Sequence, residues 1–115
     1  MNMGFLVLHM EQQMLLNQVN KLQCSLTDMT REKLTLANDI TKLTSQISDI
    51  GNSESPAVKK LEARLAELKQ FESKMDLEIQ DQQTRLQASQ TQLESVKQSL
   101  GGAIQSSFSI NYGGG

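Results

Sequence analysis

Apolar residues recur along this chain at alternating intervals of three and four positions, in two long stretches. The first stretch covers residues 5–50 and the second covers residues 58–100. A seven-residue repeat with apolar residues at its first and fourth positions, called a and d, is typical of coiled coils when it persists over several repeats. The pattern therefore predicts two long helices, each presenting one apolar seam to a partner helix.

The two stretches are separated by residues 51–56, where helix-breaking residues cluster. Glycine directly after the last apolar repeat residue, as at Gly51, is a common end of a helix. Ser55 followed by Pro56 is typical of a helix start, because serine caps the first turn and proline needs no hydrogen-bond partner there. These signals favour a helical hairpin over one kinked helix. The expected elements are a helix over 5–50, a turn over 51–55 and a helix over 56–100.

Folding the chain at this break produces a consistent register between the two stretches. Residues whose numbers add up to 108 then face each other, and every a position meets a d position, as where Ile47 faces Leu61. Antiparallel coiled coils require this pairing because reversing one helix exchanges the two positions. The sequence thus predicts an all-α fold, a long antiparallel two-helix coiled-coil hairpin that packs into a higher-order helical assembly.

A few positions of the predicted seam hold polar residues. Gln12, Gln82 and Ser89 lie in the half away from the turn and face apolar residues, which predicts that this half of the seam is the weaker one. Lys33 and Glu72 occupy adjacent layers near the middle. A Lys–Glu pair there would fix the register at some cost in stability, so we expect these two residues to be structural and not catalytic.

The start of the first helix carries more apolar residues than its seam requires. Met3, Val7, Met10 and Met14 form a second helical stripe on the outer c and f positions, and Leu6 fills a flank. A helix that is apolar nearly all round needs further burial, and a contiguous apolar band on a surface marks a contact site. We therefore expect an oligomerisation or docking surface here, with a helix lying on a membrane surface as the alternative.

The end of the chain, residues 101–115, differs in character from the seam. Gly101 and Gly102 are expected to end or loosen the second helix. The apolar residues that follow suit either one more helical turn or a short strand, and the last glycines predict a partly flexible tail. In the predicted register this tail lies beside the apolar start of the first helix. The predicted interaction residues at this end are Met3, Phe5, Leu6, Val7, Met10, Met14, Ile104, Phe108, Ile110 and Tyr112.

Composition refines this picture mainly by exclusion. Aromatic residues make up 3% of the chain, too few for a compact multilayer core, and the net charge of −2 offers nothing to attract nucleic acid. The longest apolar run, residues 5–8, is far shorter than the roughly 20 residues of a transmembrane helix. The start also lacks the features of a cleaved secretory signal. We expect a cytoplasmic protein, or one exported without a cleaved signal peptide.

The sequence offers little for catalysis or metal binding. His9 is the only histidine, and neither a cysteine nor a second histidine stands at ligand spacing from it. Cys24 is the only cysteine, which excludes an intrachain disulfide, and it occupies an outer f position without an activating neighbour. We therefore expect no catalytic residue, no metal, no cofactor and no small-molecule substrate.

Segments at the turn and near the end of the chain resemble a known family. They are Ser55-Pro56-Ala57, Ser95-Val96-Lys97 and Ala103-Ile104-Gln105-Ser106-Ser107-Phe108. These segments resemble the proline-containing turn and the Val-Lys…Ala-Ile-Ile-Gln-x-Phe ending of the needle subunits of type III secretion systems. The resemblance implies a helical hairpin that assembles into a filament. The chain departs from that family in its longer arms, in the two glycines at 101 and 102, and in the tail past residue 108.

Two classes of function remain, and both are non-enzymatic. The first is a structural or assembly subunit that self-associates through the end of the hairpin where both termini meet. The alternative is a coiled-coil adaptor or chaperone that binds a different, helical protein. The extent of the apolar band favours self-association, because the band exceeds what one transient contact needs.

Overall fold

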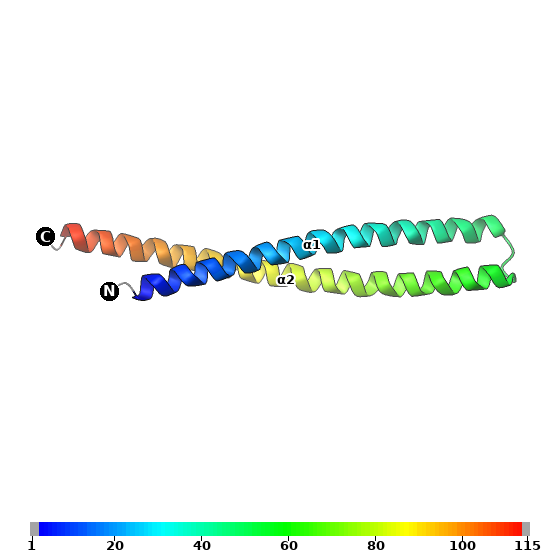
Figure 1. The fold of residues 1–115 in the computed structure, drawn as a ribbon, viewed down its shortest axis with the longest axis horizontal. Helices are drawn as coiled ribbons and strands as arrows, with labels where there is room; N and C mark the ends of the chain where they lie inside the picture. The colour runs from blue at the N-terminus through cyan, green and yellow to red at the C-terminus, as the bar shows by residue number, and fades with distance from the viewer. Residues whose placement is uncertain (1–2, 114–115) are drawn as a thin grey trace. The chain divides into compact units, whose positions relative to one another are not determined.

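The computed structural model describes residues 3–113, and the side chains of residues 4–105. Helix α1 spans Met3–Ile50 and helix α2 spans Pro56–Gly113, with 48 and 58 residues (Figure 1). Within the described residues no strand occurs. The all-α helical hairpin predicted from the repeat is confirmed, as are the end of the first helix at residue 50 and the start of the second at residue 56.

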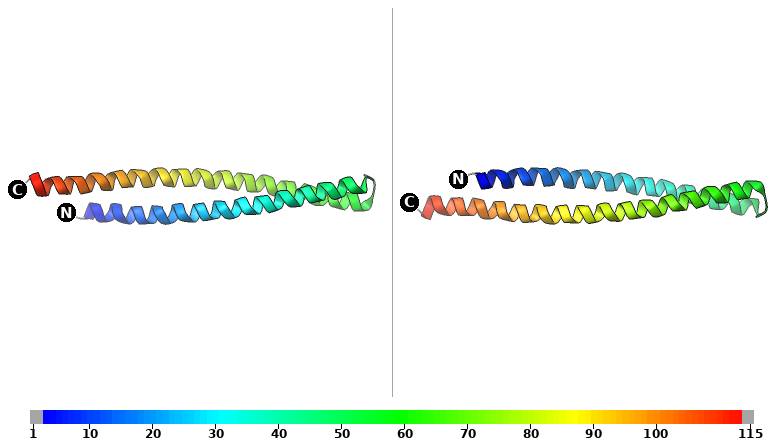
Figure 2. Two further views of the ribbon diagram at one scale, coloured as in Figure 1. Left: turned by 90° about the horizontal axis from the view of Figure 1, so that it is seen from above. Right: turned by 90° about the horizontal axis from the view of Figure 1, so that it is seen from below.

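The hairpin comprises two compact units, each built from a piece of both helices. The turn-proximal unit is Ser25–Gln82, and the terminal unit combines Met1–Cys24 with Gln83–Gly115. In each unit the segments of α1 and α2 run antiparallel and stay close to each other as they wind around one another (Figure 1 and Figure 2). Each unit is therefore a short two-helix coiled coil.

The end of α1 is set by Gly51. Its backbone lies in the left-handed region, with φ of 73°, and its N–H donates a hydrogen bond of 3.2 Å to the carbonyl of Ile47. This is the glycine-terminated helix end in which one backbone bond satisfies a carbonyl of the last turn. Glycine adopts this conformation without the steric cost that a Cβ atom would add.

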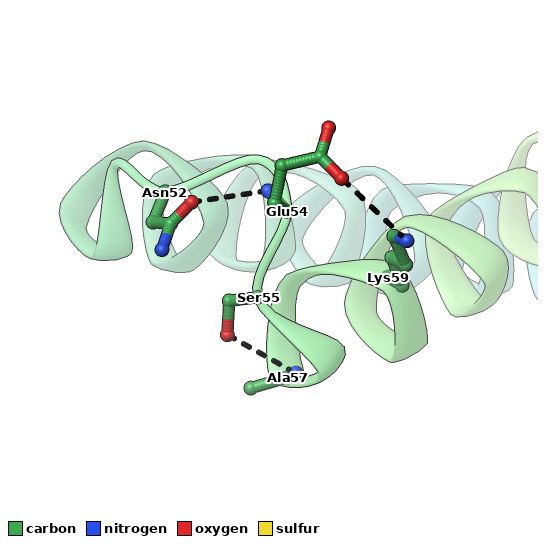
Figure 3. A network of polar contacts seen from close by, with 5 residues as sticks. All are labelled: Asn52, Glu54, Ser55, Ala57 and Lys59. Atoms are coloured by element: carbon green, nitrogen blue, oxygen red, sulfur yellow. Dashed lines mark hydrogen bonds and ion pairs between the residues drawn. The ribbon is translucent and has the colours of Figure 1, made fainter.

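The start of α2 is set by two side chains of the turn (Figure 3). The Asn52 side-chain oxygen accepts a hydrogen bond from the N–H of Glu54 at 3.1 Å, which holds the turn in place. The hydroxyl of Ser55 accepts a hydrogen bond from the N–H of Ala57 at 3.3 Å. Ser55 is thus the N-cap of α2 and Pro56 its first residue, as the sequence predicts.

The predicted seam is the buried face of both helices. On α2 every predicted a or d position from residue 58 to residue 100 is buried or half-buried, and the same holds on α1 from residue 8 to residue 47. Only the two end positions, Phe5 and Ile50, are exposed. The repeat therefore identifies the core-facing residues almost without error, because a 3.5-residue period keeps one face of a helix against its partner.

The register agrees with the predicted pairing in each unit. In the terminal unit, Leu15 lines one groove together with Gln92 and Val96, which bracket position 93, its expected partner. In the turn-proximal unit, a groove beside position 36 is lined from α2 by Phe71 and Met75, which bracket its expected partner at 72. Facing residues thus have numbers that add up to about 108.

The half of the seam predicted to be weaker contains most of the deeply buried residues. Among the described residues of the turn-proximal unit, Val58 is the one buried apolar side chain, at 1% exposure. In the terminal unit Ser89 is only 3% exposed, so this polar position does not open the seam. Burial does not measure the stability of the seam, so the weaker half stays a prediction; a short side chain such as serine does allow the two helices to remain close. The other buried residues of the terminal unit are Val19, Leu93, Val96 and Leu100.

Gln82 differs from Ser89 in how its polar group is accommodated. Its side-chain oxygen Oε1 is buried, and within the described part of the chain it has no hydrogen-bond partner. An unpaired buried acceptor costs roughly 1–3 kcal/mol. Gln82 is therefore the least favourable polar residue of the seam.

Lys33 pairs with Asp76 and not with Glu72, the partner expected from the sequence. The ammonium lies 2.5 Å from a carboxylate oxygen of Asp76, and both side chains are more than 40% exposed. The hydrogen bond from Lys33 and the attraction of the Asp76 carboxylate raise the pKa of Lys33, with a smaller contribution from Glu72. The long lysine side chain leaves the seam and reaches the flank, where residue 76 lies one helical turn beyond 72.

The direction of the Lys33 pKa shift determines the pH range in which the Lys33–Asp76 pair stabilises the fold. A raised pKa in the folded state means that the pair's contribution is complete below the ordinary lysine value of 10.5 and is lost as the pH rises through the raised value. The pair is exposed on the surface and is screened by water and salt. It therefore introduces no pH dependence of stability near neutrality.

Helix α2 does not end before Gly101 and Gly102, contrary to the expected boundary at residue 100. It continues to Gly113, so the helical alternative for the tail is confirmed and the strand is wrong. The side chain of Ala103 is half-buried at the next seam position, so the repeat continues past the glycines. Glycine weakens a helix by only about 1 kcal/mol per residue, which neighbouring helical turns can offset.

We expect a disulfide between cysteines placed at positions 47 and 61 in a Cys24→Ser background. These residues face each other within the turn-proximal unit, so oxidation should produce a fast-migrating monomer on non-reducing gels. The control is cysteines at 47 and 63, because position 63 is an outer f position that points away from the seam and should link poorly. Efficient linking of 47 to 47 between two chains would instead indicate a parallel dimer.

Gly101→Ala and Gly102→Ala should each raise the free energy of unfolding by about 0.5–1 kcal/mol. A methyl group added at either position meets no atom within 4 Å, and neither residue has a positive φ. Gly51→Ala is the matched control and should destabilise the protein because of its left-handed backbone. Thermal unfolding followed by circular dichroism would measure all three, and a loss of stability at 101 or 102 would contradict the continuous helix.

Lys33→Leu should raise the melting temperature by a few degrees. The substitution places an apolar side chain in a half-buried seam position and removes only an exposed ion pair, which contributes little. Lys42→Leu is the matched control, because Lys42 is exposed on the outer c position of the same unit and should not stabilise it. A clear drop in melting temperature for Lys33→Leu alone would mean that the pair with Asp76 sets the register.

Candidate functional site

The apolar residues predicted to form a contact site are exposed in the terminal unit. We call the described ones the apolar terminal surface, and their exposure ranges from 39% for Phe5 to 69% for Met14. Large apolar side chains exposed together on one small unit indicate a surface that another molecule covers. Four of the predicted interaction residues, Met3, Phe108, Ile110 and Tyr112, lie outside the described side chains. The apolar terminal surface consists of Phe5, Leu6, Val7, Met10, Met14 and Ile104.

Helix geometry explains why these side chains remain exposed. Val7 and Met14 occupy c positions and Met10 an f position, so all three lie on the side of α1 away from the seam with α2. Leu8 and Leu15, at d positions of the same turns, are half-buried in the seam. The first turns of α1 therefore present apolar residues on two opposite faces, and α2 covers only one of them.

A groove of about 500 Å³ between the helices of the terminal unit adjoins this surface. Its apolar lining comes from Met14, Leu15 and Val96, and Met14 also belongs to the apolar terminal surface. The hydroxyl of Thr91, on its polar side, already donates a 2.9 Å hydrogen bond to the carbonyl of Gln87. The groove thus extends the exposed apolar area from α1 onto α2. Its remaining lining residues are Glu11, Gln18, Gln92 and Ser95.

The terminal unit contains very few charged side chains. The chain has 11 basic and 13 acidic residues, and 19 of these 24 belong to the turn-proximal unit. The polar residues of the terminal unit are mainly glutamine and serine. Protein interfaces are depleted of charge at their centre and enriched in methionine, so this composition is typical of a contact surface. The charged residues of the terminal unit are Glu11, Lys21, Arg85, Glu94 and Lys97.

The one histidine and the one cysteine of the chain lie on different turns of α1. His9 stacks on Phe5, with ring centroids 6.4 Å apart and planes 6° from parallel. The two rings form an aromatic pair on α1. Cys24 is a free, exposed thiol. Among the described residues no group of three or more His, Cys, Asp or Glu side chains is placed to hold a metal ion.

Sequence reasoning missed a few exposed apolar residues in the turn-proximal unit. Leu34, Phe71 and Leu77 are each more than 60% exposed. Phe71 borders a groove of about 350 Å³ whose rim carries the charged residues Arg31 and Glu32. The heptad assignment places all three off the seam, at b, g and f positions, so the same repeat would have identified them. They are separated from one another in the sequence by several charged residues, whereas Glu11 is the one charged residue between Phe5 and Met14.

Neither helix, over its described length, combines the length and apolar character that crossing a membrane requires. Lys33 and Glu72, predicted to set the register, belong to the turn-proximal unit and take no part in the apolar terminal surface. Comparison with known proteins adds no assignment to this geometry. No protein-family model, no curated protein and no solved structure matches this chain.

Proposed function

We propose that this chain is a non-enzymatic structural or assembly subunit that self-associates through its terminal unit. The observation that carries this proposal is that one unit combines the apolar terminal surface with a near absence of charged residues. A surface of this kind gains by being covered with a similar one, because identical faces of low charge meet without repulsion. The turn-proximal unit, rich in both acidic and basic residues, remains in water.

The energetics favour coupling between folding and assembly. A two-helix coiled coil leaves about half of each helix exposed, so the apolar area that it buries offsets the entropy of ordering the chain only narrowly. Each large apolar side chain contributes about 1.5–3 kcal/mol when it becomes fully buried. Because these side chains are only 39–69% exposed, covering half of the apolar terminal surface would add about 2–5 kcal/mol, a substantial part of the stability of a small domain.

The resemblance to needle subunits of type III secretion systems supports the same kind of role. One departure from that family was the expected break of the last helix at Gly101 and Gly102. Because α2 continues through both residues, the two glycines differ from that family in sequence but do not break the helix. The support concerns the type of subunit, a helical hairpin that packs with copies of itself.

The alternative, an adaptor or chaperone that binds a different protein, is favoured by one observation. Phe71 is an exposed aromatic residue beside a groove in the charged, turn-proximal unit. Aromatic residues are frequent anchors of protein interfaces. In an adaptor, binding would depend on the surface around Phe71, and the terminal unit would not determine the mass of the free protein.

We expect Val7→Ser with Met10→Ser to yield a monomer that melts at a lower temperature than the parent. Both side chains are exposed and point away from the seam, so the loss would come from a contact between chains and not from the hairpin itself. The deletion of residues 103–115 should act in the same direction. Mass by light scattering and helicity by circular dichroism would measure the effect.

Leu34→Ser with Leu77→Ser provides the matched control. These two leucines are as exposed as Val7 and Met10 but belong to the turn-proximal unit. The control should keep the mass and melting temperature of the parent. If the Val7 and Met10 variant also has unchanged mass, helicity and melting temperature, self-association through the terminal unit is wrong. The surface around Phe71 then becomes the candidate for partner binding.

A further inference from the structure

The methionines whose side chains the structure describes fall into two classes of accessibility. Met10 and Met14 are 63% and 69% exposed, the two highest values in the apolar terminal surface. Met29 and Met75 occupy d positions of the seam and are half-buried. Met75 also borders a groove, so Met29 is the stricter reference for a shielded methionine. A reagent dissolved in water therefore reaches the thioethers at positions 10 and 14 first.

The thioether of methionine reacts with peroxides without help from neighbouring residues. The sulfur lone pair attacks one oxygen of hydrogen peroxide, the O–O bond breaks as the S–O bond forms, and the other oxygen leaves as water. Sulfur loses two electrons, and the side chain becomes methionine sulfoxide, which is polar and chiral. A dithiol reverses the change through sulfoxide reductases, with a disulfide and water as products. Exposed methionines are thus sites of a reversible modification.

The position of a sulfoxide decides what it does to this fold. At Met29 it would place a polar group between the two helices and weaken the seam. Positions 10 and 14 lie one helical turn apart on the outer side of α1, so sulfoxides there leave the seam residues Leu8 and Leu15 in place. They do change the surface, because the two most exposed members of the apolar terminal surface become polar.

We infer that Met10 and Met14 are a peroxide-sensitive modification site, whose sulfoxides make the apolar terminal surface polar while the hairpin stays folded. The site itself depends on the exposure of two thioethers in the folded chain. Its effect on self-association rests on the proposed function, because a sulfoxide buried in a contact without a hydrogen bond is unfavourable. Oxidation and assembly then compete for the same side chains, and reduction restores the contact.

Oxidation of the full-length chain by hydrogen peroxide tests the site, with Cys24→Ser to remove the exposed thiol. Peptide mass spectrometry over time measures the sulfoxide at each methionine. At low protein concentration we expect several-fold faster oxidation at positions 10 and 14 than at Met29. In concentrated urea the rates at these positions should converge, because the seam that shields Met29 is lost. Equal rates at 10, 14 and 29 in the folded chain would overturn the inference.

Retention on a hydrophobic-interaction column measures the change of surface, and circular dichroism measures whether the hairpin stays folded. The oxidised parent should elute earlier than its untreated sample and keep its helicity. In Met10→Leu with Met14→Leu both side chains remain apolar and cannot form sulfoxides, so peroxide should change the retention of this variant much less. Unchanged retention of the parent, an equal change in the leucine variant, or a loss of helicity on oxidation contradicts the inference.

Light scattering separates this inference from the proposed function. A parent that is monomeric before treatment contradicts self-association, and the oxidation rates and the retention still decide the modification site. In an oligomeric parent, oxidation of Met10 and Met14 should lower the mass, whereas the leucine variant should keep its own mass in peroxide. An oligomer that keeps its mass after both methionines are oxidised would place them outside the contact and overturn their effect on assembly.

Discussion

The a-to-d layers between antiparallel helices are the interaction on which the rest of this structure depends. Seam residues such as Ile47 and Leu61, which the repeat pairs with each other, are half-buried between α1 and α2, and these are the two elements of the described chain. The a-to-d spacing fixes which face of each helix is inside, and thereby which residues remain outside. The position of the turn follows from the same layers, because Gly51 ends α1 where the first seam ends.

The outside of the hairpin divides into two unlike surfaces. The turn-proximal unit carries most of the charge and has isolated exposed apolar residues such as Phe71. The terminal unit carries few charges, and its exposed apolar residues, such as Met10 and Met14, are clustered. A solvated coiled coil is ordinarily covered by charged residues throughout. The difference between the two units is therefore the main physical support for placing function at the terminal unit.

Polar residues in the seam are accommodated by three different means. Ser89 is small enough to be buried, Lys33 extends out of the seam to Asp76, and Gln82 keeps one unpaired buried oxygen. Size and length thus decide the outcome more than polarity does. Counting polar positions therefore does not predict burial, since the terminal unit holds most of the deeply buried side chains.

The sequence by itself determined the number of helices, the turn, the seam and the stripe of exposed residues on α1. These depend on local signals and on one period, which a single chain displays directly. Only the tertiary structure decided that Lys33 pairs with Asp76, that Ser89 is buried and that α2 continues through Gly101 and Gly102. Each of these depends on the distance between facing helices or on the support of neighbouring turns. The period of the sequence specifies which face is inside, but not how closely two faces approach or how far a long side chain reaches.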